Sequence, residues 1–333
     1  MIAGAMTAEA RGHASPFPPG DVHRRLSAVL RERFSGRRVK KIPLDAGFTC
    51  PNIDGTVARG GCIYCRNEAF HPGPLGSGLS VTRQLEIGIA RDRRRGERLG
   101  PPRHDGYLAY FQTFTNTHAP LEELAPLWSE ALAVDGVLGI VIATRPDCLP
   151  DQVLDRLEDI ARGGRFVALE IGLQSASGAA LEFANRAHTV ADFEDAARRA
   201  GGRGIDVSAH VVFGFPGDDD ALVRRTASLL AGLPLDGVKL HHLHVVKGTV
   251  LERMHARGEF EPVGRADYVR FAADFLERIP SRFAIHRLVA TTPERFLVAP
   301  AWTREAAAVA REIEGTLRER GSFQGRLSPA RPA

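Results

Sequence analysis

Six short apolar runs, each followed by a longer segment in which apolar residues recur at helical spacing, constrain the fold of this chain more than any other feature. Runs that are apolar at nearly every position indicate strands buried on both faces, as in a parallel sheet covered by helices. The expected strands are 39–44, 107–111, 137–143, 166–173, 207–215 and 238–246. The expected helices are 22–34, with Asp21 as its N-cap, then 81–98, 121–133, 152–162, 193–201, 220–230 and 304–320.

Successive strand–helix units with right-handed crossovers curl into a barrel, so we expect an α/β fold with a partial (β/α)6 barrel of the TIM type. A doubly wound open sheet is the alternative, because pattern alone does not separate the two. The 333 residues suffice for one such unit with short additions. We expect an N-terminal lead-in and helix over 1–37, the barrel over 38–280, and a C-terminal extension over 281–333 that packs on the barrel.

The composition is that of a folded globular protein, with 44% hydrophobic and 25% charged residues. It excludes a disordered chain and a disulfide-dense secreted scaffold. The net charge of +4 is too small to require a nucleic-acid partner. No run reaches the roughly 18 apolar residues needed to span a bilayer, and the start lacks the apolar core of a signal peptide. We therefore expect a cytoplasmic protein without a membrane partner.

Three of the four cysteines, Cys50, Cys62 and Cys65, fall in one glycine-rich loop after the first expected strand. In a reducing compartment such clusters indicate metal or redox ligands. Structural zinc takes a closed set of four ligands, whereas three thiolates on a four-iron cluster leave one iron open to a substrate or cofactor. We favour the open iron–sulfur site, with structural zinc or a dithiol redox site as alternatives. His71 or Cys148 could supply a fourth ligand, although Cys148 is better explained as a packing residue.

Polar motifs follow the expected strands, where ligands collect in both candidate folds. The histidines at 241, 242 and 244 are expected to line the barrel or to hydrogen-bond a substrate. Seven motifs carry a resemblance: PLDAGFTCPN (43–52), GGCIYC (60–65), YFQTFTN (110–116), TRPDCL (144–149), EIGLQS (170–175), GFPG (214–217) and LHVVKGT (243–249).

In this order the motifs resemble those of the radical S-adenosylmethionine (SAM) superfamily, in particular its YhcC/YtqA-type branch. That branch is itself similar to the radical domain of the elongator catalytic subunit. The resemblance implies a radical SAM enzyme whose cysteines Cys50, Cys62 and Cys65 hold a [4Fe-4S] cluster with SAM on the fourth iron. One electron, from a reductase such as flavodoxin or ferredoxin, would cleave SAM to methionine and a 5′-deoxyadenosyl radical. The substrate is not identified by the motifs; the elongator similarity suggests a tRNA base, with a small molecule or a protein as alternatives.

Eight further residues are expected to contact SAM, each with a plainer alternative. Tyr64 would lie against the adenine or be a core aromatic. Glu170 faces the barrel interior if its strand alternates, and a buried carboxylate needs a partner such as a ribose hydroxyl or a cation. The others are Gln112 or Thr113 for the methionine amine, Gln174 with Arg186 for the methionine carboxylate, and Gly214 and Gly217 for close approach of the nucleoside. Arg186 could instead be a surface arginine, and the two glycines a strand-to-helix turn.

A function of a different class is also open. The cysteine loop, together with the basic runs 31–41 and 91–98, would suit a zinc-stabilised RNA-binding protein without catalysis. Solvated helix faces explain the basic runs equally simply.

Overall fold

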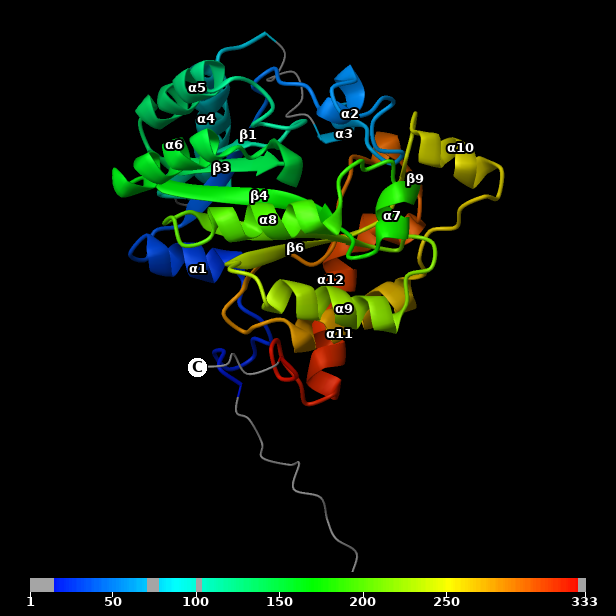
Figure 1. Cartoon of the computed structure of the whole chain (residues 1–333). Helices are drawn as coiled ribbons and strands as arrows, with labels where there is room; N and C mark the ends of the chain where they lie inside the picture. Colours follow the sequence, from blue (N-terminus) through cyan, green and yellow to red (C-terminus); the bar gives the residue numbers. More distant parts are fainter. Residues whose placement is uncertain (1–14, 71–77, 100–103, 329–333) are drawn as a thin grey trace, which may run out of the picture.

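The strands of the main sheet pair in the order in which they follow along the chain. In the computed structural model, which describes residues 15–70, 78–99 and 104–328, the sheet has seven parallel strands. They are β1 (Val39–Leu44), β2 (Gly106–Phe111), β3 (Val137–Thr144), β4 (Phe166–Gln174), β5 (Asp206–Phe213), β6 (Gly237–His242) and β8 (Ala284–Arg287). A doubly wound sheet would reverse its order in the middle, so that alternative is wrong. The sheet curls into a half-barrel, and the expected partial barrel is confirmed (Figure 1).

Helices cover the outer face of the curled sheet (Figure 1). Trp128, Phe193 and Phe275 come from three of these helices and are fully buried in one hydrophobic core with strand residues such as Ile140 and Leu169. Burying a side chain of this size contributes about 1.5–3 kcal/mol. The covering helices are α4 (Val81–Leu99), α5 (Leu121–Ala133), α6 (Asp151–Arg162), α8 (Val190–Ala200), α9 (Asp220–Ala231) and α11 (Arg265–Arg278).

The helix α1 (Leu26–Arg33) packs against the two edge strands, β1 and β8. Its Leu30 is buried in a second apolar cluster inside the barrel. The partners of Leu30 in that cluster are Leu108, Tyr110, Val141, Phe166 and Ala168. The expected start of this helix at residue 22 and the N-cap at Asp21 are wrong. The backbone of Arg24 and Arg25 instead pairs with Ile285, so the helix begins only at Leu26.

The expected strand 238–246 is divided into two. β6 ends at His242, and β7 (Val245–Val246) pairs antiparallel with β9 (Leu297–Ala299) in a separate small sheet. The segment 281–333, expected to pack on the barrel, supplies β8 as an edge strand of the main sheet. It also supplies α12 (Ala306–Glu319), which packs against α11.

Short elements lie mainly in the loops after the strands. They are α2 (Pro51–Asp54), α3 (Asn67–Phe70), η1 (Pro146–Cys148), α7 (Gly178–Phe183), α10 (Val250–Ala256), η2 (Glu294–Phe296) and η3 (Ala301–Glu305). In the part of the chain that the structure describes, no helix combines the length and the apolar character that crossing a membrane requires.

The close pairing of β3 with β4 depends on Gly139. An added Cβ at this position would overlap the carbonyl oxygen of Phe166, so the β4 backbone would have to move. We expect Gly139→Ala to lower the free energy of unfolding by about 1–3 kcal/mol, measured by urea denaturation. Gly178→Ala is the control, because a Cβ there meets no atom within 4 Å. Equal stability of the two variants would contradict this account of the β3–β4 pairing.

Candidate functional site

A cavity of about 450 Å³ lies at the C-terminal ends of the strands. The cysteine loop lines it together with residues of β2, β3, β4, β5, β6 and β8. Most of the residues predicted from the sequence meet here: Cys50, Cys62, Tyr64, Cys65, Gln112, Glu170, Gln174 and Arg186. The histidines at 241, 242 and 244 also line this cavity.

The cysteine loop is fixed in place by two asparagines. The Asn52 amide donates to the carbonyl oxygens of Asn185, at 2.5 Å, and Arg186, at 3.2 Å, and its nitrogen lies 3.7 Å from the Cys62 Sγ. In return, the Asn185 amide donates to the carbonyl of Gly61 at 2.8 Å. The loop therefore reaches its position through contacts with the chain after α7, more than 120 residues away.

The three loop cysteines form a donor set that is open on one side. Cys50 and Cys62 are buried, whereas Cys65 is exposed at the cavity. Among the described residues, no group of three Cys, His, Asp or Glu side chains is gathered so as to hold a single metal ion. A four-iron cluster places its thiolates on separate irons, so three thiols around an open cavity fit this group better than a closed zinc site.

The two candidates for a fourth ligand have different outcomes. Cys148 is buried, but it does not line the cavity. Burial and the adjacent Asp147 carboxylate raise the pKa of the Cys148 thiol to about 12, which keeps it neutral. This is the behaviour of a packing residue. His71 lies outside the described residues.

Arg186 and Gln174 converge on Gly172. A Cβ on Gly172 would lie 2.5 Å from the Gln174 Nε2 and 2.6 Å from a terminal nitrogen of Arg186, so only glycine leaves room for both side chains. Arg186 is buried, and its guanidinium lies 3.5 Å from the Cys62 Sγ and donates to the His188 Nε2 at 2.9 Å. It is therefore not a surface arginine.

Tyr64 lies at the wall of the cavity and packs against one of the apolar clusters. Its ring lines the cavity and also makes an edge contact with Phe215, with 6.3 Å between the ring centroids. One side of the ring is thus supported by the small apolar cluster around Phe215. A supported aromatic ring at a cavity wall is suited to stack on a flat ligand.

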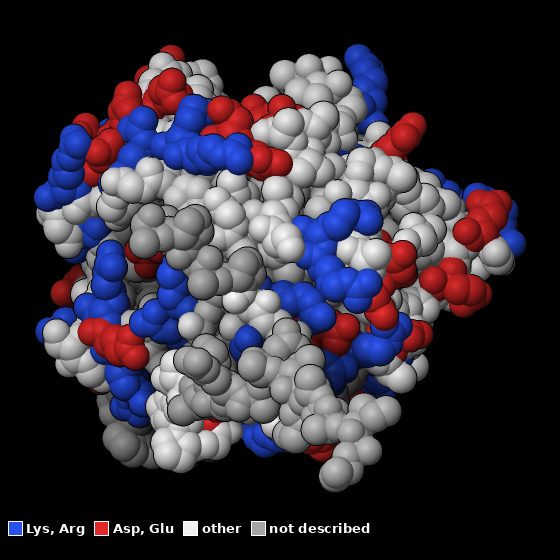
Figure 2. All heavy atoms as spheres, turned by 60° about the horizontal axis from the view of Figure 1, so that its bottom comes forward, with Lys and Arg blue, Asp and Glu red and all other residues white. Residues whose placement is uncertain are grey.

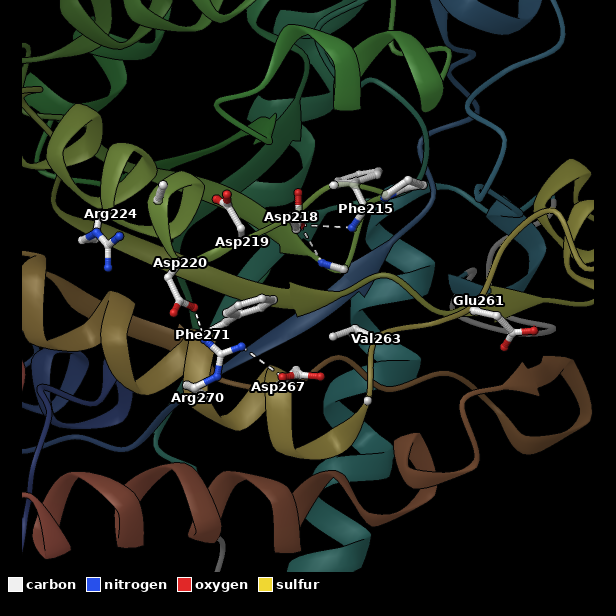
Figure 3. Close-up of a pocket in the computed structure, with 15 residues that line it drawn as sticks. Phe215, Asp218, Asp219, Asp220, Arg224, Glu261, Val263, Asp267, Arg270 and Phe271 are labelled. Carbon is white, nitrogen blue, oxygen red and sulfur yellow. Dashed lines mark hydrogen bonds and ion pairs between the residues drawn. The ribbon is translucent and has the colours of Figure 1, made fainter.

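Three predicted contacts are not brought to this cavity. The Thr113 hydroxyl donates to the Asp45 carboxylate at 3.0 Å and lies in the protein interior. Gly214 and Gly217 line a different pocket, between the turn after β5 and α11 (Figure 3). There the Asp218 carboxylate accepts hydrogen bonds from the backbone N–H groups of Gly214, at 2.8 Å, and Phe215, at 3.0 Å. Gly214 has a φ of +104°, so the strand-to-helix turn accounts for this glycine.

Glu170 lies at the centre of a charged cluster inside the barrel. Its side chain is completely buried, and its partners come from five other strands. The carboxylate accepts from the Tyr110 hydroxyl at 2.6 Å, the Lys239 Nζ at 2.7 Å, the His210 Nε2 at 2.8 Å, the His286 Nδ1 at 3.3 Å and the Lys41 Nζ. We expected either a ribose hydroxyl or a cation as the partner of this carboxylate. The protein itself supplies cations, the two lysines, together with neutral donors.

The protonation states of this cluster follow from burial and charge. Burial alone would raise the pKa of Glu170, but Lys239 and Lys41 hold it well below its usual range, so the carboxylate is ionised. Burial lowers the pKa of Lys239 to about 8, with Glu170 opposing the shift and Arg287 and Lys41 adding to it. Burial likewise lowers the pKa of His210 to about 3 and that of His286 to about 4, so both rings are neutral at pH 7.

The sequence predicts Glu170 as a buried carboxylate of the barrel interior, but the cations around it were not predicted. The sequence did contain a signal for them, because residues two positions apart on a strand share one face of the sheet. Lys239 and His241 are spaced in this way in a largely apolar run, as are Glu170 and Gly172. A lysine in such a run is unusual in a chain whose 44 basic residues include only four lysines. These observations together would have pointed to a polar barrel interior.

Comparisons with known proteins agree with this geometry. The model of the Radical SAM superfamily matches residues 55–230, and that of the Radical SAM C-terminal domain matches residues 235–319. The Bacillus subtilis protein YtqA is 37% identical over 94% of this chain and 96% of its own length. A tRNA uridine(34) acetyltransferase of Methanocaldococcus jannaschii is 26% identical over 48% of this chain and 30% of its own length.

A solved structure shows the same fold. The Elp3 protein of Methanocaldococcus infernus, with an N-terminal deletion, superposes with a TM-score of 0.62 at 17% identity. The superposition covers 86% of this chain and 64% of that chain. The superfamily model spans more than half of the chain, and the similarity to YtqA spans nearly all of it. The chain therefore belongs to the radical SAM superfamily of enzymes.

Proposed function

We propose that Cys50, Cys62 and Cys65 hold a [4Fe-4S] cluster and that the cavity beside them receives SAM and the substrate. The observation that carries this proposal is the meeting of three thiols with the charged barrel interior in one cavity. When bound, the cluster and SAM would supply a 5′-deoxyadenosyl radical that takes a hydrogen atom from the substrate. The protein's own contribution is to hold both partners in register and to keep water from the reaction.

Four residues are assigned to SAM in this proposal. Arg186, beside Cys62, would bind the methionine carboxylate, because a guanidinium pairs with a carboxylate through two parallel hydrogen bonds. Gln174 meets Arg186 over Gly172 and would donate to the same carboxylate. Gln112 would contact the methionine amine, and Tyr64 would stack on the adenine.

For the substrate we propose a base of tRNA. Support comes from the similarity to proteins named tRNA uridine(34) acetyltransferases, which covers about half of this chain. A cytoplasmic location and a flavodoxin or ferredoxin as electron donor belong to the same proposal.

The basic run 31–41 gives little support to RNA binding. Arg33 pairs with Asp206 at 3.4 Å, Arg38 with Asp105 at 3.8 Å and Lys40 with Asp92 at 2.5 Å. On the face shown in Figure 2, basic and acidic side chains are intermingled. Of the second run, 91–98, the side chains of 96–98 lie outside the described residues. A solvated surface therefore explains Arg33, Arg38 and Lys40, whereas Lys41 contacts Glu170 in the barrel interior.

Anaerobic reconstitution with iron and sulfide tests the enzyme class. The loaded protein should show the broad visible absorption of thiolate-to-iron charge transfer, and after reduction with dithionite it should release 5′-deoxyadenosine from SAM. One zinc per chain after anaerobic purification, without iron or sulfide, would favour the zinc-stabilised RNA-binding alternative.

For the substrate, total tRNA should be retained in a salt-sensitive way and should stimulate 5′-deoxyadenosine release. Failure of both tRNA measurements would leave the enzyme class intact and overturn the tRNA substrate.

A further inference from the structure

The floor of the cavity carries more positive than negative charge. Lys41, Lys239 and Arg287 are brought together around one carboxylate, that of Glu170. Both lysines make ion pairs with this carboxylate, whereas Arg287 has no ion pair with any acidic residue among those that the structure describes. Because His210 and His286 are neutral, the cluster has an excess of two positive charges at pH 7.

Arg287 is a cation of this cluster to which the described residues offer no direct ion pair, although the Glu170 carboxylate lies near enough to act on its pKa. It ends β8 and lines the cavity, and its Nε is buried without a hydrogen-bond partner among the described residues. One terminal nitrogen lies 2.5 Å from the Nε2 and 2.9 Å from the Nδ1 of His241, a ring that burial keeps neutral. Burial also lowers the pKa of Arg287 from its usual value, which is the sign of a guanidinium that lacks a compensating anion.

Arg145, which is fully buried and lines the same cavity, is a guanidinium whose partners are all supplied by the protein. Arg145 makes two hydrogen bonds to the Asp147 carboxylate, at 2.9 and 2.7 Å, and a third to the Arg186 carbonyl at 2.8 Å. Removing a guanidinium from water without such a partner costs several kcal/mol. The difference between Arg145 and Arg287 indicates that the counter-ion of Arg287 arrives with a ligand.

We propose that Arg287 and Lys239 form an anion subsite that binds a carboxylate or phosphate group of the substrate. Both residues line the cavity, and they come from β8 and β6, at the other end of the strand order from β1, which leads into the cysteine loop. Arg186 lies at the cysteine end and is assigned to SAM, so the two guanidinium groups serve different ligands. The inference rests on the proposed function only in taking the cavity as the substrate site.

The test measures anion binding by the cluster-loaded protein under anaerobic conditions. Sodium acetate, inorganic phosphate and neutral acetamide are titrated at ionic strength held constant with sodium chloride, and the melting temperature and heat of binding are recorded. We expect acetate or phosphate, but not acetamide, to bind saturably and to raise the melting temperature. Binding of acetate alone assigns a carboxylate, and binding of phosphate alone assigns a phosphate.

Variants locate the anion. Arg287→Gln should weaken binding of the anion by about tenfold or more, since a charge-assisted hydrogen bond is lost. Arg225→Gln, on the exposed face of α9, should leave binding unchanged. Arg287→Lys keeps the positive charge but lacks the planar set of donors, so this variant should bind the anion with intermediate affinity. It provides the test if the Arg287→Gln variant does not fold.

Three results would overturn the anion subsite. They are binding no tighter than that of chloride, unchanged binding by Arg287→Gln, and displacement of acetate by saturating SAM, which would assign the subsite to the cofactor. None of these measurements requires radical formation. Anion binding without 5′-deoxyadenosine release would overturn the proposed function alone, and the reverse result would overturn the subsite alone.

Discussion

Replacing Cys65 with alanine is expected to reduce 5′-deoxyadenosine formation to the level of a protein-free control. With two thiolates left, the cluster would lose one of its three protein ligands and would not be retained. Cys65 is exposed at the cavity, so its removal should disturb the packing of the chain little. The measurements are iron and sulfide per chain, the visible absorption after reconstitution, and the amount of 5′-deoxyadenosine released after reduction.

Cys148→Ala is the matched control for Cys65→Ala. Cys148 is a buried thiol away from the cavity wall, so its loss should leave the iron content and product formation unchanged, with a small decrease in stability. Iron retention by the Cys65 variant, or iron loss in the Cys148 variant, would contradict the assignment of ligands.

Six of the seven strands of the main sheet, and their order, could be predicted because most of them are nearly continuous apolar runs. The seventh strand, β8, was missed because half of its four residues, His286 and Arg287, are polar. The bounds failed where tertiary contacts decide. The run 238–246 contains no residue that marks where the chain leaves the sheet, yet β6 ends at His242 because the following residues turn to pair with β9. The long helix α11 was missed, although Tyr268, Ala272 and Phe275 recur at helical spacing and are fully buried.

In the candidate site, too, the residues that are close in sequence could be predicted, whereas contacts between distant residues could not. The spacing of the cysteines is local, so the sequence indicates them directly. The ion pair between Lys41 and Glu170 joins residues 129 positions apart, and only the register of the strands brings them together. The motif around Gly214 was placed correctly along the chain, but motif order does not tell whether a turn faces the cavity or the outer pocket in which Figure 3 shows it.

Glu170→Gln is expected to produce the largest loss of stability among single changes in the barrel interior. The substitution keeps the shape of the side chain but leaves Lys41 and Lys239 without the carboxylate with which both make ion pairs. Removing one partner of a buried ion pair costs about 3–5 kcal/mol, and we expect a decrease of that size in the free energy of unfolding at pH 7. Glu259→Gln, which breaks the exposed pair with Arg257, should leave the free energy of unfolding nearly unchanged, because solvent screens this pair.

The dependence of this difference on pH separates a charge effect from a packing effect. The pKa of Glu170 in the folded protein lies well below its ordinary value of 4.5, so between these two values the unfolded chain binds more protons than the folded one. The stabilisation by Glu170 is therefore complete above about pH 4.5 and is lost as the pH falls toward the folded pKa. Urea unfolding of the wild type and the Glu170→Gln variant from pH 7 to pH 3.5 should show a constant difference down to about pH 4.5 and a shrinking one below it. A difference that stays the same over the whole range would mean that the amide disturbs packing, and that the carboxylate charge does not hold the barrel interior together.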